Sequence, residues 1–565
     1  MVFAKYSLFL CQNENIFLIR LITLNYTQSF SRFKGLFYMK THHSTAVFRF
    51  GEDFLTIGAA LRLARNEMQG TLTDDTLARV KANQEVVRNI VSRKKVVYGI
   101  NTGFGPLCTS LIDQDETRQL QYNLLMSHSV GVGNFIAPEI AKLMLILKLH
   151  ALCKGFSGIA VETVERILWH IENDVIPCVP EQGSVGASGD LAPLSHLFLP
   201  LIGMGKVFHN GKEKSAEEVL KEFKLKPVEL GPKEGLALIN GTQFMAAHAV
   251  SLLERLQNCL DHADIIAAMN LEAMMGSVKP FDEHLHELRP HSGSKYVAGR
   301  MRALLDHSQI VESHTECGRV QDPYSLRCIP QVHGASRNAW LHLKETVLTE
   351  INSVTDNPIV FSEDKTISGG HFHGQPIALP MDYVGLAAAE LGNIADRRVY
   401  LSMMASTPGL PKLLMEHTGL NSGFMILQYS TAALASENKS LCFPASADSI
   451  PTSLGQEDHV SMGSIASRKS LRIVENLEKI LGIEMMCAAQ GFDFRKPMKS
   501  NILLDEMHNL IREHISFAET DRLFSDDIQK SIELLRSKAI IKRLNTVAEK
   551  QGIDLKNESD EVWGI

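Results

Sequence analysis

The longest regular pattern of apolar residues lies between Thr242 and Met275, a stretch that contains neither glycine nor proline. Apolar side chains recur there at steps of three and four residues, which is the spacing of one face of an α-helix. They are Ala249, Leu252, Leu253, Leu256, Leu260, Ala263 and Ala267. At about 1.5 Å per residue this helix would be about 50 Å long. That length is unusual for a globular domain and indicates a bundle of extended helices.

Two further stretches predict long helices. The segment from Met498 to Gln551 lacks glycine and proline, and Ser525, followed by two aspartates, is an N-cap signal at which we expect the helix to restart. The segment from Met381 to Ser406 is a third helical candidate, interrupted by Gly385 and Gly392.

Glycines concentrate outside these stretches, in "YGINTGFGP" (98–106), "HSVGVG" (128–133), "EQGSVGASGDLAPLSH" (181–196) and "SGGHFHGQP" (368–376). Such loops let the backbone approach a ligand closely. Strand signals are few and short, as in "AVFRF" and "PIVF". The pattern therefore predicts a mainly α protein, with a glycine-loop-bearing N-terminal domain over residues 39–240. An extended central bundle of long helices and a C-terminal helical region follow over residues 241–565.

The first forty residues are rich in aromatic and apolar side chains, but polar residues interrupt them and no small-residue cleavage site follows, so a secretory signal fits poorly. Residues 1–38 are set apart as an N-terminal extension, because translation starting at Met39 would leave them out. Both start codons remain open.

Composition excludes several classes of function. A net charge of −7 over 565 residues gives no basic surface for nucleic acid, and no run of about 18 uncharged apolar residues suggests a membrane span. The nine cysteines form no CxxC pair, which is typical of reduced thiols in a cytoplasmic protein. We expect no metal site, because "HLHELRPH" and "HFH" lack metal-ligand spacing and an evident third ligand. A hydrolase serine is also a poor fit, since Ser188 departs from the G-x-S-x-G pattern.

The tripeptide Ala187-Ser188-Gly189 can instead supply an electrophile from the backbone. If a tight turn brings the Gly189 nitrogen to the Ala187 carbonyl carbon, attack closes a five-membered ring, and Gly189 has no Cβ to oppose the compression. The ring then loses one water, and the Ser188 hydroxyl leaves as a second water. The product is an imidazolone with an exocyclic methylidene. The serine is consumed in this chemistry, so it needs no neighbouring base.

The surrounding "GSVGASGDLAPLSH" resembles the signature of the aromatic amino acid ammonia-lyases, and the resemblance extends over nearly the whole chain from about Phe48. It implies the mainly helical fold of fumarase and the ammonia-lyases. It also implies a 4-methylidene-imidazol-5-one group (MIO), formed autocatalytically from Ala187, Ser188 and Gly189, with no exogenous cofactor.

The same resemblance assigns roles to other residues. Tyr98 in "YGINTGFG" matches the base that removes the β-proton, and Asn240 in "GLALINGTQ" matches the asparagine beside the MIO group. In "QDPYSLRC", Gln321, Tyr324 and Arg327 match the segment that contacts substrate and MIO, with Arg327 gripping the substrate carboxylate. Phe372 in "GGHFHGQP" matches an aromatic residue of the active-site wall.

Two positions point to the substrate. His128 follows Ser127, as in family members that act on histidine, and Glu457 is an acid where phenylalanine and tyrosine enzymes carry an amide. A carboxylate can hold an imidazole proton, whereas against a phenyl ring it would be a desolvated charge without a partner. The resemblance thus implies L-histidine, converted to trans-urocanate and ammonia in the first step of histidine degradation. In "GHFHGQP", His371, Gly374 and Gln375 depart from the histidine branch, which commonly has "GNFHAEP".

The resemblance further implies a homotetramer whose active sites are shared between subunits, with no nucleic acid or membrane partner. A tyrosine or phenylalanine ammonia-lyase and an MIO-dependent aminomutase remain alternatives. The signature loop of fumarase-type lyases, GSSxMPxKxN, is absent. An intact Ser188 hydroxyl in the purified chain would indicate a non-enzymatic helical scaffold.

Overall fold

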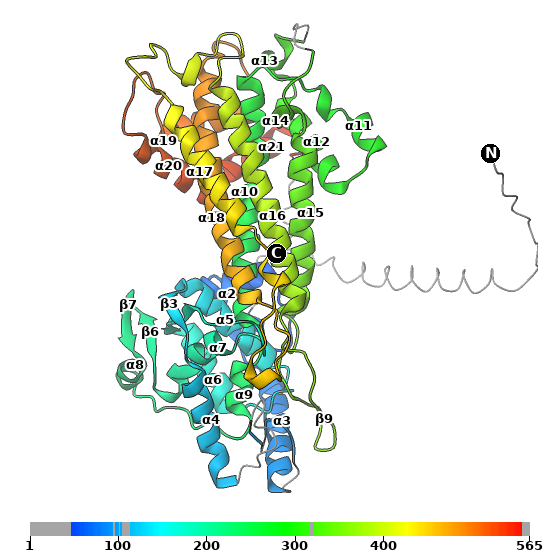
Figure 1. Ribbon diagram of the computed structural model, residues 1–565, viewed down its shortest axis with the longest axis vertical. Coiled ribbons are helices and arrows are strands. Elements are labelled where there is room, and N and C mark those ends of the chain that lie inside the picture. Colours follow the sequence, from blue (N-terminus) through cyan, green and yellow to red (C-terminus); the bar gives the residue numbers. More distant parts are fainter. Residues whose placement is uncertain (1–46, 94–95, 101, 104–113, 316–319, 556–565) are drawn as a thin grey trace, which may run out of the picture. The chain divides into compact units, whose positions relative to one another are not determined.

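The long helix expected between Thr242 and Met275 is present as α10 (Gln243–Ala273), flanked by Thr242 and Met274 as its caps. The computed structural model describes residues 47–93, 96–100, 102–103, 114–315 and 320–555, and within them α10 is buried along almost its whole length. It packs against α5 (Pro138–Leu152), α15 (Ile329–Glu350), α16 (Gln375–Ser402) and α18 (Gly463–Asp493). Figure 1 shows these long helices running alongside one another. The prediction of a mainly α protein built on a bundle of long helices is confirmed.

The other helices of the second half surround this centre. They are α11 (Glu283–Leu288), α12 (Ser292–Leu305), α13 (Gln309–Glu312), α14 (Tyr324–Arg327), α17 (Met425–Leu441), α19 (Ile502–His514), α20 (Phe524–Arg536) and α21 (Ala539–Gln551). Short 3₁₀ turns are η2 (Leu199–Ile202), η3 (Lys279–Phe281), η4 (Lys412–Leu414), η5 (Ala445–Ala447) and η6 (Ser453–Gly455).

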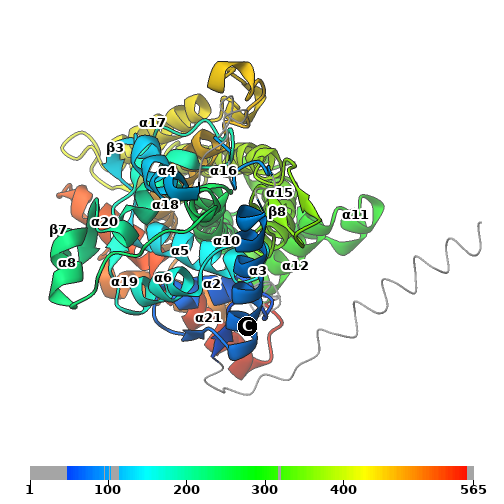
Figure 2. The same ribbon diagram turned by 90° about the horizontal axis from the view of Figure 1, so that it is seen from below.

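The first half combines shorter helices with short strands. Its remaining helices are α2 (Ile57–Ala64), α3 (Asp74–Ser92), α4 (Gln114–His128), α6 (Val161–Glu172), α7 (Leu191–Phe198), α8 (Ala216–Glu222) and α9 (Glu234–Ile239). The strands of the described chain are β1 (Phe48–Arg49), β2 (Gly70–Thr71), β3 (Val132–Phe135), β4 (Ile176–Pro177), β5 (Pro180–Gln182), β6 (Lys206–His209), β7 (Lys212–Ser215), β8 (Ile359–Val360) and β9 (Thr366–Ile367). They pair as β1-β2, β3-β5, β4-β6-β7 and β8-β9, with only β1-β2 parallel. Helices α2, α5 and α7 of this half contact α10, and Figure 2 shows α2 and α5 beside it.

Glycines in α16 do not interrupt the helix, contrary to the sequence prediction. A Cβ added at Gly385 would lie 2.9 Å from the Ser470 Oγ, and one at Gly392 would lie 3.1 Å from the Ile480 Cδ1. Both glycines therefore lie where α18 approaches closely, and the missing side chain serves helix packing.

The C-terminal region is helical as predicted, but it divides into three helices. The restart comes at Phe524 with Leu523 as N-cap, so the assignment of Ser525 as the N-cap is wrong. Arg522 explains the shift, because its Nε donates to the Asp527 Oδ2 at 2.7 Å and spans the first turn of α20.

Residues 1–38, set apart as an extension, lie outside the described residues. The domain boundary at residue 240 stays a prediction, although α10 begins shortly after it, at Gln243. No helix among the described residues has the length and apolar character needed to cross a bilayer.

Candidate active site

Six of the residues singled out by sequence line one cavity of about 590 Å³. They come from loops or helix ends that are far apart in the chain: Tyr98, His128, Ser188, Asn240, Phe372 and Glu457. The elements that carry them include the ends of α4 and α9 and the loops that precede α7, α16 and α18. The cavity therefore forms where the glycine-rich loops of the first half meet loops that precede two bundle helices.

The turn at Ala187-Ser188-Gly189 is tightly packed against Gly241. Gly189 has φ +76°, and a Cβ there would lie 2.1 Å from the Gly241 carbonyl oxygen. The same oxygen accepts a hydrogen bond from the Asp190 amide at 2.8 Å. Only glycine fits at position 189, because any other residue would meet both the left-handed φ and the neighbouring backbone.

A second contact holds the start of this turn from the other side. Gly186 has φ +70°, and a Cβ there would lie 2.2 Å from the Ser461 Oγ. That hydroxyl donates to the Gly186 carbonyl at 3.1 Å, and the Met462 amide donates to the Val185 carbonyl at 2.9 Å. The turn is thus held between the Gly241 backbone and the segment that leads into α18. A side chain at Gly186 or Gly189 would collide with these contacts, so the two glycines allow the turn to be this compact.

The Ser188 hydroxyl donates to the Glu457 Oε1 at 2.8 Å. The other carboxylate oxygen of Glu457 accepts from the hydroxyls of Thr452 and Ser453, at 2.9 and 2.8 Å. These two hydroxyls fix the carboxylate in the wall of the cavity and leave Oε1 directed at Ser188.

His128 is the last residue of α4, and its Nδ1 lies 3.0 Å from the Ser127 Oγ. Burial lowers the pKa of His128, while the negative charge of Glu457 acts in the opposite direction. His128 is therefore a mainly neutral imidazole at pH 7 that can donate or accept a hydrogen bond in the cavity.

Asn240 is buried at the end of α9, where its Nδ2 donates to the Asn357 carbonyl oxygen at 2.8 Å. The Lys148 ammonium donates to the Asn240 carbonyl, and burial lowers the pKa of Lys148 to about 8. Asn357 also accepts from the Gly369 amide at 2.8 Å through its side-chain oxygen. It thereby links Asn240 to the loop that carries Phe372.

Sequence reasoning missed three residues that support the cavity: Lys148, Asp190 and Asn357. Asp190 is fully buried directly after the tripeptide, and its carboxylate accepts from the Ser464 hydroxyl at 2.8 Å and from the Met245 amide at 3.1 Å. Burial raises the pKa of Asp190 to about 7. Asp190 could have been identified from its position in "GASGDLAPL". Lys148 lies in a mainly apolar segment, and nothing in the sequence around it indicates a role in the site.

Gln321, Tyr324 and Arg327 do not line this cavity within one chain. Tyr324 and Arg327 belong to α14, which lies farther up the bundle in Figure 1 than α4, α7 and α9. The Tyr324 side chain is 70% exposed, and the Arg327 guanidinium carbon stacks over its ring, 4.6 Å from the centroid. Gln321 is exposed just before α14. The structure thus brings six of the predicted residues together and leaves these three on another surface.

A family model described as aromatic amino acid lyase matches residues 55–513. The chain belongs to this family. A histidine ammonia-lyase of Myxococcus xanthus (strain DK1622) is 45% identical over 486 residues, which are 86% of this chain and 96% of that protein.

Solved structures of two enzymes have the same fold. The histidine ammonia-lyase of Trypanosoma cruzi matches with a TM-score of 0.82 at 40% identity, covering 89% of this chain and 95% of that one. The tyrosine aminomutase of Streptomyces globisporus matches with a TM-score of 0.83 at 33% identity, covering 89% of this chain and 99% of that one. The family is thus assigned over most of the chain.

Proposed function

We propose that this chain eliminates ammonia from L-histidine and releases trans-urocanate. The observation that carries the proposal is the fixed carboxylate of Glu457, which lines the cavity beside Ser188 and acts electrostatically on His128. The similarity to a histidine ammonia-lyase at 45% identity supports the same substrate.

The polarity of this wall favours an imidazole over a phenyl ring. An imidazole N–H can donate to the Glu457 carboxylate, and His128 can bind the second ring nitrogen. A phenyl ring would leave the Glu457 Oε1 desolvated and without a donor, at a cost of about 1–3 kcal/mol or more.

We infer that Ala187, Ser188 and Gly189 mature into an MIO group with no exogenous cofactor. The Cβ-free contact between Gly189 and Gly241 supports this inference. The group would supply an electrophilic methylidene carbon for the substrate amino group. Its formation removes the Ser188 hydroxyl as water, so the Glu457 Oε1 loses its present donor and can accept one from the substrate ring.

The remaining cavity residues bind the substrate and transfer its proton. Tyr98 is the base that takes the β-proton, a task for which a phenol of ordinary pKa near 10 must be held against the carbon as phenolate. Asn240 is fixed by Asn357 beside the tripeptide, and Phe372 forms part of the apolar wall.

We further propose that Gln321, Tyr324 and Arg327 enter the cavity of another copy within a homotetramer, so that Arg327 grips the substrate carboxylate there. The exposure of Tyr324 and the position of α14 outside the cavity support this arrangement. Co-expression of Ser188→Ala chains with Arg327→Gln chains tests it. Shared sites predict that the mixture regains part of the activity that each variant lacks alone, and light scattering should give the mass of four chains. A fully active monomer would contradict the shared site.

The substrate assignment is tested by incubating the purified chain with L-histidine, L-tyrosine and L-phenylalanine in parallel. We expect ammonia and a conjugated, ultraviolet-absorbing acid from histidine. Ammonia from tyrosine or phenylalanine but not from histidine would overturn the assignment. A β-amino acid product would identify an aminomutase, an alternative that the fold similarity to a tyrosine aminomutase keeps in view.

A further inference from the structure

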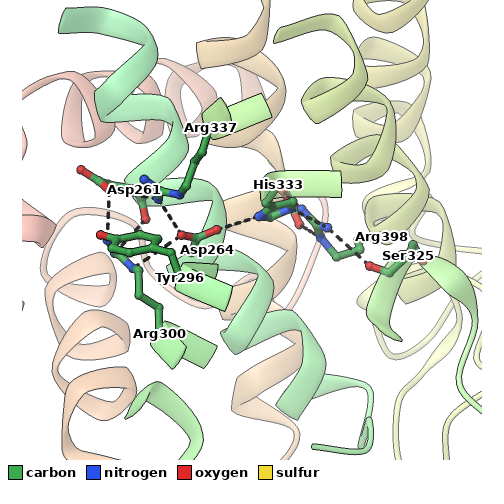
Figure 3. Close-up of polar contacts among 9 residues, drawn as sticks. Asp261, Asp264, Tyr296, Arg300, Ser325, His333, Arg337 and Arg398 are labelled. Atoms are coloured by element: carbon green, nitrogen blue, oxygen red, sulfur yellow. Dashed lines mark hydrogen bonds and ion pairs between the residues drawn. The ribbon is translucent and has the colours of Figure 1, made fainter. Parts of the chain in front are cut away.

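The centre of the helix bundle contains a network of buried charged side chains, which Figure 3 shows. Three arginines face three carboxylates there, and none of the six residues is more than 6% exposed. They are Arg300, Arg337, Arg398, Asp261, Asp264 and Glu484. The Arg337 Nη2 lies 2.7 Å from the Asp264 Oδ2 and 3.1 Å from the Asp261 Oδ1, and the Arg300 Nη1 lies 3.0 Å from the same Asp261 oxygen. The network thus contains as many guanidinium groups as carboxyl groups.

His333 of α15 extends this network toward α16. Its Nδ1 lies 2.8 Å from the Asp264 Oδ1, and burial lowers the pKa of His333 to about 4, so the ring is neutral. A neutral ring that donates its Nδ1–H to Asp264 has an acceptor at Nε2. This Nε2 faces the Arg398 Nη1 at 3.4 Å.

Arg398 in turn joins the network to α14. Its Nε donates to the Glu484 Oε1 at 2.5 Å and its Nη2 to the Oε2 at 3.3 Å, a two-pronged pairing that fixes the guanidinium plane. The Nη1 then donates to the Ser325 carbonyl oxygen at 3.4 Å. Ser325 lies between Tyr324 and Arg327 in a helix of only four residues.

Stability alone does not explain such a network. Removing charges from water costs several kcal/mol per ion, and well-packed apolar residues of similar volume commonly stabilise a fold as well or better. Buried polar groups with defined directions can instead select one geometry.

We propose that Arg398, oriented by His333 and Glu484, is a positioning residue for the substrate-binding segment. It fixes the Ser325 carbonyl and so sets the place of Tyr324 and Arg327 on the surface that α14 presents. The inference rests on the proposed role of Arg327 in binding the substrate carboxylate. It adds that the buried residues around Arg398 determine how precisely Arg327 is placed to bind the substrate carboxylate.

The test removes the guanidinium without leaving an unpaired charge. The double variant Arg398→Met with Glu484→Gln keeps an oxygen that can accept from Asn270, which now donates to Glu484 at 2.8 Å. We expect thermal unfolding, molecular mass and the loss of two waters at the tripeptide to match the parent. We expect kcat/KM to fall about 10- to 100-fold, with a raised KM, because a shift of the grip by about 1 Å has that effect.

Tyr296→Phe is the matched control. It removes a hydroxyl that lies 3.2 Å from the Arg300 Nη1, and Figure 3 shows Tyr296 beside Arg300, on the side of the network opposite Arg398. We expect its kcat/KM to stay within about twofold of the parent. An equal loss in the control, or a folded double variant with the kcat/KM of the parent, would overturn the inference.

His333→Asn decides the matter if the double variant does not fold. Its amide nitrogen can still donate to Asp264, but nothing replaces the Nε2 acceptor that faces Arg398. We expect a raised KM with an unchanged midpoint of unfolding, and an unchanged KM counts against the proposal.

A parent enzyme that prefers another aromatic amino acid overturns only the substrate assignment, and the same comparison is then made with that amino acid. A parent that converts none overturns the proposed function and this inference with it.

Discussion

The Ser188 hydroxyl and the Glu457 carboxylate lie 2.8 Å apart although 269 positions separate them in the chain. This contact joins the residue proposed to become part of the electrophile with the residue proposed to select the substrate. Both roles therefore depend on one small region of the cavity, where Thr452 and Ser453 hold the carboxylate.

Replacing Glu457 should separate substrate selection from maturation. Glu457→Gln retains an oxygen that can accept from Ser188, so we expect intact-mass measurement to show both water losses. Turnover of L-histidine should fall about 100-fold or more, because a neutral amide replaces the charged carboxylate that accepts from the imidazole N–H. The exposed neighbour Asp458 supplies the control, since Asp458→Asn changes charge by the same amount outside the cavity. Unchanged histidine turnover in Glu457→Gln would remove Glu457 from the site.

Ser188→Ala should abolish activity, because the methylidene carbon of the proposed MIO group comes from the serine side chain. We expect the mass to show that the second water is not lost, and the free energy of unfolding to change little. Ser195→Ala, in α7 and outside the lining of the cavity, should retain both turnover and the full mass change. Activity in Ser188→Ala above background would contradict the MIO proposal.

Gly189→Ala should block maturation by steric conflict. The new Cβ would lie 2.1 Å from the Gly241 oxygen at a φ of +76°, so the turn must open. Gly211→Ala is a control for backbone strain alone, because Gly211 has φ +71° with no atom of the described chain within 4 Å of the added Cβ. We expect about 1 kcal/mol of destabilisation in the control and a larger value, with no water loss, in Gly189→Ala. Equal destabilisation by the two substitutions would show that the contact with Gly241 is unimportant.

Asp190 should make the chain less stable as pH rises toward neutrality. Burial raises the pKa of Asp190 to about 7 in the folded protein, so the folded state holds a proton that the unfolded state has already released above about pH 4. The stabilisation by this protonated carboxyl is therefore present at low pH and lost as pH rises to 7.

Denaturant unfolding between pH 5 and 7 measures this effect against Asp190→Asn. We expect the free energy of unfolding to fall by a few kcal/mol more in the parent than in the variant across this range. The exposed Asp526→Asn should follow the parent. Parallel curves for parent and Asp190→Asn would show that Asp190 ionises normally.

The sequence predicted most accurately the helix whose pattern is uninterrupted. Thr242 to Met275 has no glycine or proline, and α10 follows it closely. The equally long α18 was missed because Gly463, Gly482 and Gly491 break its pattern. A Cβ at Gly482 would lie 2.9 Å from the Ile532 Cγ1, so tertiary packing against α20 explains the glycine.

The candidate site was accessible from sequence only through its resemblance to a family. Nothing in the spacing of Tyr98, Ser188 and Glu457 places them around one cavity, because three separate loops converge only in the folded chain. Asp190 and Lys148 were missed since their importance comes from burial, which single-sequence patterns do not report. The position of α14 away from the cavity likewise reflects a tertiary arrangement that its motif does not encode.

The hydrogen bond from Ser461 to the turn also bears on when the proposed MIO group can form during protein synthesis. Ser461 holds Gly186 across 275 positions, so the two meet only after most of the polypeptide has left the ribosome. A nascent chain that ends before this serine lacks the hydroxyl that grips the turn. The proposed cyclisation therefore follows folding of these distant segments, and the nascent chain does not yet carry the proposed electrophilic carbon.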